Sequence, residues 1–348
     1  DAITIPEMLK NGGYATALIG KWHLGMSDGL HPLDQGFDYW YGTPGSNDWD
    51  GPRPNYDSFK EASEEAWKTP LIVNRENKGA VVSQSLFTKR YTEEALRLIR
   101  RHSQKPFYIY LSYNMPHVPI FASSSFKGKS RNGVYGDVVK EIDWSVGQII
   151  KTIDNEDLTK NTIVVFTSDN GPWTMFKEFG GVTGVLRGEK STTWEGGERV
   201  PFIVSWPKKI APGVSNQLMV NYDIYATFAN LSGIMVSQGQ AIDSIDFSSH
   251  WLDGAQGNRA KHLYYFHQPM AYRKGHYKLH NYTRSRSRDP YTGKSEPSVF
   301  HDEGLLYNLL NDIGEKNNIS PEYPDRVKLL QKEFKEAQLA IKEWRPFQ

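Results

Sequence analysis

Apolar positions in the first 260 residues form two kinds of pattern that follow each other along the chain. Continuous apolar runs predict buried strands at residues 15–19, 107–113, 162–167 and 200–206. Helical patterns lie between them, at residues 4–11, 83–101, 137–153 and 223–231. Buried strands separated by helices are typical of a mainly parallel sheet that is covered on both faces. We therefore predict an α/β domain over residues 1–260.

The pattern changes at two places. Residues 26–80 are rich in Gly, Pro, Asp and aromatic residues with little periodicity, which predicts a long functional loop region. From residue 261 onward the apolar segments are short, at 262–266, 271–273, 276–280 and 305–307, and a terminal helix is expected at 324–344. These features predict a smaller C-terminal α+β subdomain over residues 261–348, with a small antiparallel sheet.

Composition excludes several classes of protein. The chain has 348 residues, 41 basic and 40 acidic, so its net charge of +1 gives no general attraction for nucleic acid or membrane surfaces. It has no cysteine, which excludes disulfides and thiolate metal sites. No apolar run reaches the roughly 18 residues that a membrane span needs. The chain opens at Asp1 without a methionine, so we expect a processed or truncated N-terminus and give the missing signal peptide little weight.

A lysine and a histidine follow the first predicted strand. The strand ends at Gly20, and Lys21 and His23 come next, two positions apart. If the chain stays extended here, the two side chains project to the same side. A fixed cation beside a titratable imidazole suits the binding of a tetrahedral oxyanion. Taken alone, the pair could equally be a solvated lysine and a structural histidine.

Three further polar clusters lie near predicted strand ends. His117 follows the strand at 107–113, Asp169 and Asn170 follow the strand at 162–167, and Lys190 lies in a glycine-rich loop before residue 200. Ligands of open α/β sheets bind at the carboxyl ends of the strands, so we expect these clusters to converge. The Asp-Asn pair offers hard oxygen ligands for Ca²⁺ or Mg²⁺ and not for zinc. The simpler alternatives are a turn, a hydrogen-bonded loop histidine and a surface lysine.

Several of these motifs, in this order, resemble one enzyme family. Residues 13–25, Gly-Tyr-Ala-Thr-Ala-Leu-Ile-Gly-Lys-Trp-His-Leu-Gly, resemble the second signature of the formylglycine-dependent sulfatases. Residues 168–172 resemble the family's metal-binding pair, and residues 188–201 resemble the segment with its sulfate-binding lysine. Residues 42–48 resemble, more weakly, a loop that supplies a serine, here Ser46. Residues 135–143 and 306–318 resemble the middle helix and the C-terminal subdomain. The chain is most similar to the arylsulfatase A and N-acetylgalactosamine-6-sulfatase type and to bacterial polysaccharide sulfatases.

The resemblance implies an alkaline-phosphatase-like fold and the hydrolysis of sulfate esters. It implies that Ca²⁺ is held by Asp169 and Asn170, and that Lys21 and Lys190 neutralise the sulfate oxygens. It further implies that His117, with Lys190, protonates the leaving sugar oxygen, and that His23 accepts a proton from the formylglycine nucleophile. Ser46 would join Lys21, His23, His117 and Lys190 in binding the substrate.

One departure from the family pattern concerns the nucleophile. Sulfatases carry it in a Cys/Ser-x-Pro/Ala-x-Arg motif, with two metal-binding aspartates further upstream, and neither is present here. Residues 4–6 resemble the stretch that follows these motifs, so we expect that the chain starts after the first βα segment and needs the missing N-terminal segment for activity. Two alternatives stay open: a phosphate or phosphonate ester hydrolase of the same superfamily, and a non-catalytic binder of sulfated glycans.

The expected partner is a sulfated oligo- or polysaccharide, such as a glycosaminoglycan or a carrageenan-like galactan. Residues 26–80 and the basic stretch Arg284, Arg286 and Arg288 are candidate specificity regions, although the basic stretch could equally be a solvated surface loop. We expect no nucleic-acid partner and a periplasmic or secreted location, with a lysosomal one as the weaker alternative. A homo-oligomer is compatible with the sequence.

Overall fold

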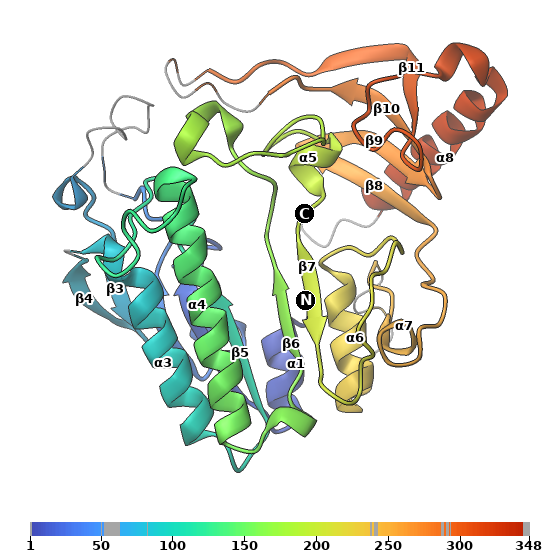
Figure 1. Cartoon of the computed structure of the whole chain (residues 1–348). Helices are drawn as coiled ribbons and strands as arrows, with labels where there is room; N and C mark the ends of the chain where they lie inside the picture. Colours follow the sequence, from blue (N-terminus) through green and yellow to red (C-terminus); the bar gives the residue numbers. More distant parts are fainter. Residues whose placement is uncertain are drawn as a thin grey trace.

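A computed structural model describes residues 2–49, 51, 63–81, 83–236, 239, 243–286, 289, 292 and 294–343. Figure 1 shows an α/β part, which holds the chain as far as α7 (Ser248–Asp253), and a smaller sheet with one long helix near the C-terminus. The predicted α/β class and the predicted C-terminal sheet are both present.

The main sheet has five strands in the order β4-β3-β2-β1-β5. Strand β1 (Ala15–Lys21) lies between β2 (Tyr39–Thr43) and β5 (Phe107–Ser112), and both pairings are parallel. The remaining strands, β3 (Pro70–Val73) and β4 (Glu76–Ala80), add antiparallel pairs at one edge. Strands β6 (Val164–Thr167) and β7 (Phe202–Ser205) form a separate antiparallel pair. The sheet is therefore mixed, with parallel pairing confined to β2, β1 and β5.

Strands β2, β3 and β4 lie in the region predicted to be a loop, so that prediction is wrong for these segments. Gly42 interrupts the short β2, and every residue of β4 is exposed at the sheet edge. Neither strand therefore shows the apolar alternation or the continuous apolar run that marks a strand in sequence. Residues 52–62 of the same region lie outside the described part of the chain.

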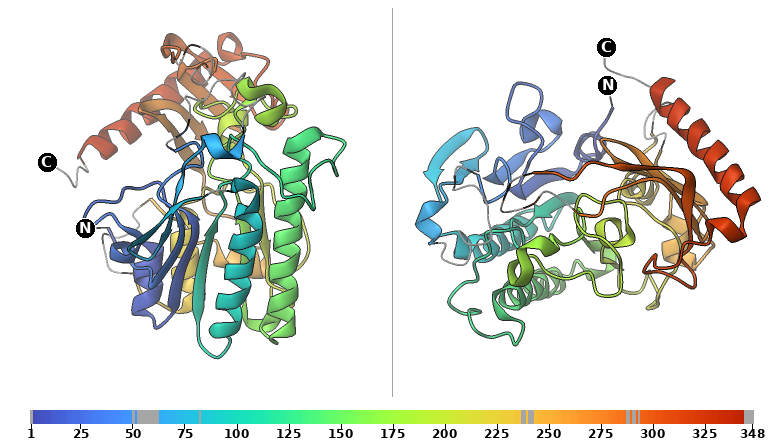
Figure 2. Two further views of the ribbon diagram at one scale, coloured as in Figure 1. Left: turned by 90° about the vertical axis from the view of Figure 1, so that its left-hand side faces the viewer. Right: turned by 90° about the horizontal axis from the view of Figure 1, so that it is seen from above.

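Helices cover both faces of this sheet, as the two sides of the left view in Figure 2 show. Ala17 and Ile19 of β1 pack toward α3 (Phe87–Arg101) and α4 (Gly133–Asn155), while Leu18 packs with Trp40. On the other side α1 (Ile5–Asn11), capped by Thr4 and Glu7, packs against α6 (Asp223–Ser232). The short helices are α5 (Glu195–Glu198) and α7 (Ser248–Asp253), with 3₁₀ turns η1 to η6 at Pro32–Gln35, Glu64–Ala66, Gln84–Leu86, Thr159–Asn161, Thr174–Phe179 and Ser320–Glu322. In the described residues no helix is both long and apolar enough to cross a membrane.

The C-terminal sheet is antiparallel, in the order β11-β10-β9-β8. Its strands are β8 (Lys261–Phe266), β9 (Gln268–Lys274), β10 (Tyr277–Thr283) and β11 (Val299–Asn308). Helix α8 (Pro324–Glu343) packs on one face through Leu330 and Phe334, which meet Leu279 and Leu306 of the sheet. The right view of Figure 2 shows α8 on the outer side, away from the α/β part. The sheet therefore has its other face available for the α/β part.

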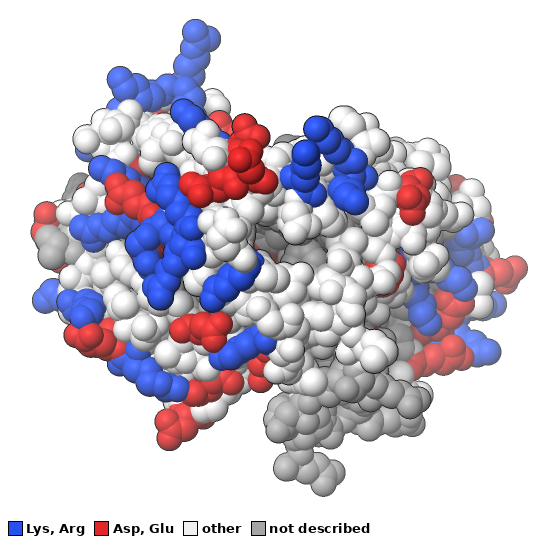
Figure 3. Space-filling view, turned by 90° about the horizontal axis from the view of Figure 1, so that it is seen from below, with Lys and Arg blue, Asp and Glu red and all other residues white. Residues whose placement is uncertain are grey.

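Charged side chains of both signs are mixed on the face shown in Figure 3, where Lys and Arg alternate with Asp and Glu. This mixture agrees with the net charge of +1. A general electrostatic field on this face is therefore weak, and local arrangements of charge decide what the protein can bind.

Candidate functional site

The carboxyl ends of the parallel strands β2, β1 and β5 meet at one edge of the sheet. Lys21 is the last residue of β1, and the segments with Ser46 and His117 follow β2 and β5. Gly20 permits the close approach of these strands: its φ is +105°, and a Cβ there would lie 1.8 Å from the carbonyl oxygen of Ser112. Glycine at this position therefore fixes where Lys21 leaves the strand.

Lys21 brings the end of β1 together with the segment after β6. Its Nζ lies 3.6 Å from Oδ2 of Asp169, and its side chain is 16% exposed whereas that of Asp169 is 65% exposed. Lys190 belongs to the same electrostatic group. Burial lowers the pKa of Lys190, Lys21 lowers it further, and Asp169 opposes both effects. Two lysines from distant parts of the chain thus act electrostatically on one another and on the carboxylate of Asp169.

His117 is half-buried, and both lysines act on its charge. Burial and then Lys190 lower its pKa to about 4, so the ring is neutral near pH 7. Its Nδ1 lies 2.6 Å from the carbonyl oxygen of Val118, an acceptor, so Nδ1 carries the proton and Nε2 is the nitrogen available to a ligand. Trp173 lies against both groups, with its ring 6.3 Å from that of His117 and 5.2 Å from Lys190 Nζ.

His23 reaches the site by a different backbone path from the predicted one. Strand β1 ends at Lys21, and His23 has a φ of +66°, so the expectation of an extended chain through His23 is wrong. Its N–H donates to the carbonyl oxygen of Pro44 at 2.8 Å, which ties it to the loop after β2. Burial and then Lys21 lower the pKa of His23. The two side chains are therefore close, although strand alternation is not the cause.

The loop after β2 brings one predicted residue and two that sequence reasoning missed. Ser46 is buried and its Oγ donates to Asp48, whose charge raises the pKa of both His23 and His117 against the stronger effect of burial. Trp49 is 44% exposed. Its ring and the ring of His23 both lie close to Gly45, so a Cβ at Gly45 would contact both rings. Asp48 is the last residue of the motif at 42–48 that contains Ser46, and this position was the signal that could have identified it.

Asp169 and Asn170 have the donor chemistry of a Ca²⁺ site. The side-chain NH₂ of Asn170 donates to the carbonyl oxygen of Gly171 at 2.8 Å, which leaves the amide oxygen as the metal-binding atom. Carboxylate and amide oxygens suit a hard cation, but two ligands fill only part of the six to eight positions that Ca²⁺ takes. In the part of the chain that the structure describes, no group of three His, Asp or Glu residues could complete such a site.

The basic stretch divides into different environments. Arg284 is 3% exposed, lies 4.2 Å over the Phe266 ring and donates from Nη1 to the carbonyl oxygen of Ser191 at 3.0 Å. Arg284 is therefore neither a specificity residue nor part of a solvated loop, because packing fixes it next to Lys190. Arg286 forms an exposed ion pair with Glu296, and Arg288 lies outside the described residues.

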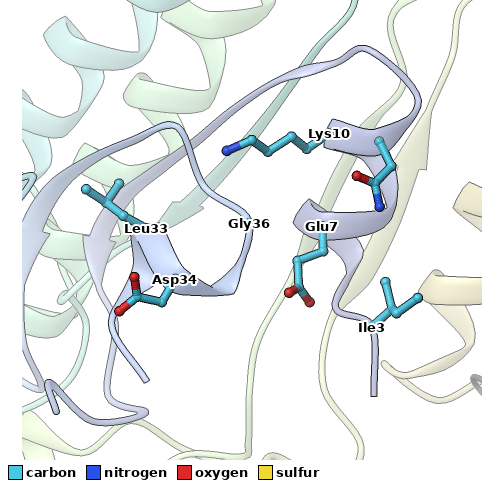
Figure 4. Close-up of a pocket in the computed structure, with 7 residues that line it drawn as sticks. Ile3, Glu7, Lys10, Leu33, Asp34 and Gly36 are labelled. Carbon is cyan, nitrogen blue, oxygen red and sulfur yellow. The ribbon is translucent and has the colours of Figure 1, made fainter. Parts of the chain in front are cut away.

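A hollow of about 270 Å³ lies elsewhere, between α1 and η1, and is shown in Figure 4. The charged residues that line it already have partners: Glu7 closes the cap with Thr4, Lys10 pairs with Asp38, and Asp34 pairs with Arg75. None of the predicted site residues lines it. We therefore do not assign it to the site.

Comparison with known proteins identifies the family of this chain. Residues 3–234 match the sulfatase profile, and residues 258–346 match the profile of the C-terminal region of aryl-sulfatase. The chain belongs to the sulfatase family. This confirms the resemblance on which the site residues were selected.

Individual sulfatases agree with this assignment over nearly the whole chain. An arylsulfatase from Hemicentrotus pulcherrimus is 33% identical over 90% of this chain and 61% of its own length. An N-acetylgalactosamine-6-sulfatase from Mus musculus is 35% identical over 93% of this chain and 66% of its own length. The solved PsFucS1 sulfatase from Pseudoalteromonas sp. superposes with a TM-score of 0.87 at 25% identity, over 99% of this chain and 74% of that one. The alkaline-phosphatase-like fold is thereby confirmed, and this chain spans less than two thirds of the length of these two curated sulfatases.

Proposed function

We propose that this chain is part of a sulfatase that removes sulfate from a sulfated carbohydrate. The main support is the convergence of Lys21, Lys190 and His117, which act electrostatically on one another, with Lys21 Nζ 3.6 Å from the carboxylate of Asp169. A sulfate group placed there would meet two ammonium groups and one imidazole. Such a cationic pocket stabilises negative charge on sulfate oxygens before and during bond cleavage.

Each side chain has a proposed role. Lys21 and Lys190 bind the sulfate oxygens. His117 becomes protonated on Nε2 when the bound sulfate raises its pKa, and it gives that proton to the leaving sugar oxygen. His23 accepts a proton from the nucleophile, and Ser46, oriented by Asp48, adds a hydroxyl contact to the substrate. Asp169 and Asn170 would hold Ca²⁺, which when bound supplies further positive charge opposite the sulfate.

We propose that a formylglycine nucleophile and the remaining Ca²⁺ ligands come from a segment outside residues 1–348. Two strand edges support this proposal. Within the described residues β5 pairs only with β1 and β6 only with β7, so each leaves one edge without a strand partner. Unpaired edges are ready to accept another strand. A strand added there would end close to Lys21 and Asp169, at the edge where the site lies.

A saccharide substrate is supported by the rim of the site. Trp49 is a half-exposed ring next to His23, and aromatic faces offer sugars a flat apolar surface. The similarity to an N-acetylgalactosamine-6-sulfatase agrees with a sulfated glycan as substrate. We propose a glycosaminoglycan or a sulfated galactan, met in the periplasm or outside the cell.

The function is tested with the full-length protein that carries this chain. We expect it to release sulfate from a panel of sulfated oligosaccharides, and to release phosphate from matched phosphate or phosphonate esters much more slowly. Faster phosphate release would identify it as a phosphate or phosphonate ester hydrolase. Binding of the sulfated sugars without any release would identify it as a non-catalytic glycan binder.

Metal binding gives a separate prediction. Asp169→Asn should weaken Ca²⁺ binding by the full-length protein at least about tenfold, because a hard dication loses a charged ligand. Isothermal titration calorimetry measures this, with Asp253→Asn at an exposed position of α7 as the matched control. Equal Ca²⁺ affinity in Asp169→Asn and wild type would remove Asp169 from the metal site.

The protonation of His117 gives another prediction. Burial, Lys190 and Lys21 lower its pKa and Asp48 raises it, so a bound sulfate, which offsets both lysines, should raise it toward the usual range. Lys190→Ala should raise the pKa of free His117 for the same reason. Histidine NMR titration with and without inorganic sulfate measures both changes, and a His117 pKa that ignores sulfate would contradict its place beside the anion.

A further inference from the structure

A buried charge network joins the C-terminal sheet to the α/β part. It consists of Glu195 in α5, Lys278 and His280 in β10, and Glu315 after β11. Lys278 Nζ lies 2.9 Å from Glu195 Oε1 and 3.1 Å from Glu315 Oε1. His280 Nε2 lies 2.7 Å from the same Glu315 oxygen. Lys278, His280 and Glu315 are completely buried, and Glu195 is 2% exposed.

The two carboxylates of the network are offset by Lys278 and by Arg199, which pairs with Glu195. Burial alone would raise the pKa of Glu195, but Lys278 and Arg199 outweigh it and lower the pKa to about 2. Burial lowers the pKa of His280 to about 4, more than its bond with Glu315 raises it, so this ring is neutral. Lys278 is therefore a buried cation between two carboxylates. A residue without exposed surface cannot reach a substrate, so its effect on the site must pass through other residues.

The network contacts the backbone of the segment that carries Lys190, residues 187–199, here called the Lys190 loop. The N–H of Glu195 donates to Oε2 of Glu315 at 2.7 Å, and Nη1 of Arg187 donates to the carbonyl oxygen of Glu315 at 2.9 Å. Trp194 Nε1 donates to the carbonyl oxygen of Arg284 at 2.8 Å. The C-terminal sheet and its flanking segments therefore hold the Lys190 loop at several points on both sides of Lys190.

The other side of the Lys190 loop holds the segment that carries the metal ligands. The N–H of Lys190 donates to the carbonyl oxygen of Pro172 at 2.9 Å, and the N–H of Gly171 donates to that of Gly197 at 2.9 Å. Gly171 directly follows Asn170. A continuous chain of hydrogen bonds thus runs from the C-terminal sheet through the Lys190 loop to the ligand pair. Figure 1 shows α5 in this place, between the central strands and β8 to β10.

We propose that Lys278, His280 and Glu315 are positioning residues for catalysis. They fix the Lys190 loop, and through it they set the place of the Lys190 ammonium group and of Asp169. Buried ion networks add little net stability compared with apolar packing, whereas they can specify one arrangement of the chain. The catalytic part of this inference rests on the proposed sulfatase function, and the fixing of the loop does not.

Amide hydrogen exchange of the full-length protein tests the fixing of the loop. Lys278→Met should increase exchange across residues 190–197 at least about tenfold, because it removes the cation that the two buried carboxylates share. Lys274→Met removes an exposed lysine of the same sheet, paired with Glu333, and should leave this exchange unchanged. If Lys278→Met does not fold, Glu315→Gln serves for the same measurement, because it removes the negative charge and one of the two acceptor oxygens that bind the Glu195 N–H, Lys278 and His280. Unchanged exchange at residues 190–197 in a folded network variant overturns the proposal.

A double-mutant cycle tests the effect on catalysis. The network variant should lower kcat about 10- to 100-fold in the wild-type background, since small displacements of a catalytic group cost this much. In the Lys190→Ala background the same variant should lower kcat by a clearly smaller factor, because Lys190, one of the two groups that it displaces, is already absent. Equal losses in both backgrounds would show general destabilisation and overturn the positioning role. If the wild type hydrolyses no sulfate ester, the proposed function fails, and the exchange measurement still decides whether the loop is fixed.

Discussion

Lys21→Ala and Lys190→Ala should each lower the turnover of a sulfated saccharide by about two to three orders of magnitude. Both ammonium groups lie at the carboxyl edge of the sheet, Lys21 on β1 and Lys190 on the loop before β7. Each variant therefore removes positive charge opposite the same developing anion. The loss should appear in kcat if the contact tightens in the transition state, and in KM if it binds substrate and transition state equally. Steady-state kinetics of the full-length protein measure both constants.

The double variant provides an internal check. Because both lysines act on one sulfate group, the combined loss in free energy should be smaller than the sum of the two single losses. Lys332→Ala, on an exposed part of α8, should leave turnover unchanged. Wild-type turnover in both Lys21→Ala and Lys190→Ala would show that the sulfate lies elsewhere.

His117→Ala should slow substrates with poor sugar leaving groups far more than activated aryl sulfates. A sugar alkoxide needs a proton as it leaves, and general acid catalysis contributes about 10²- to 10⁴-fold, whereas an aryl oxide leaves with little protonation. The half-buried ring, held by Val118 and close to Lys190, is placed to deliver that proton once an anion is bound. The ratio of kcat/KM for the two substrate classes, in variant and wild type, measures the effect.

A histidine outside the site provides the control for this comparison. His250→Ala, on α7, should leave the ratio of the two rates unchanged. An equal loss on both substrate classes in His117→Ala would instead make His117 a binding residue without an acid role.

The sequence predicted the proximity of the candidate site residues better than it predicted the strands around them. Lys21 and His117 follow the parallel strands β1 and β5, whose carboxyl ends lie at one edge. Asp169 follows β6 of the separate antiparallel pair, and its contact with Lys21 does not follow from that rule. Strand β4 was missed because it has no large apolar residue and is fully exposed. Its strand structure depends on pairing with β3, a tertiary contact that local pattern does not report.

The buried charge network could not be predicted for a related reason. Lys278 and Glu195 are 83 positions apart, and a lysine and a glutamate in sequence indicate exposed positions. Arg284 was expected to be a specificity or surface residue for the same reason, whereas the structure buries it beside the Lys190 loop. Pairing between α5, β10 and the segment after β11, rather than any local signal, makes these positions tolerable for charge.

The central claim is that one sulfate-binding site is built at this sheet edge. A structure of the full-length protein with a bound sulfated oligosaccharide tests this claim most directly. We predict that the sulfate group lies within hydrogen-bond distance of both Lys21 Nζ and Lys190 Nζ, with the ester oxygen next to Nε2 of His117. A sulfate group bound elsewhere on the molecule, with these three side chains turned away from it, would contradict the account.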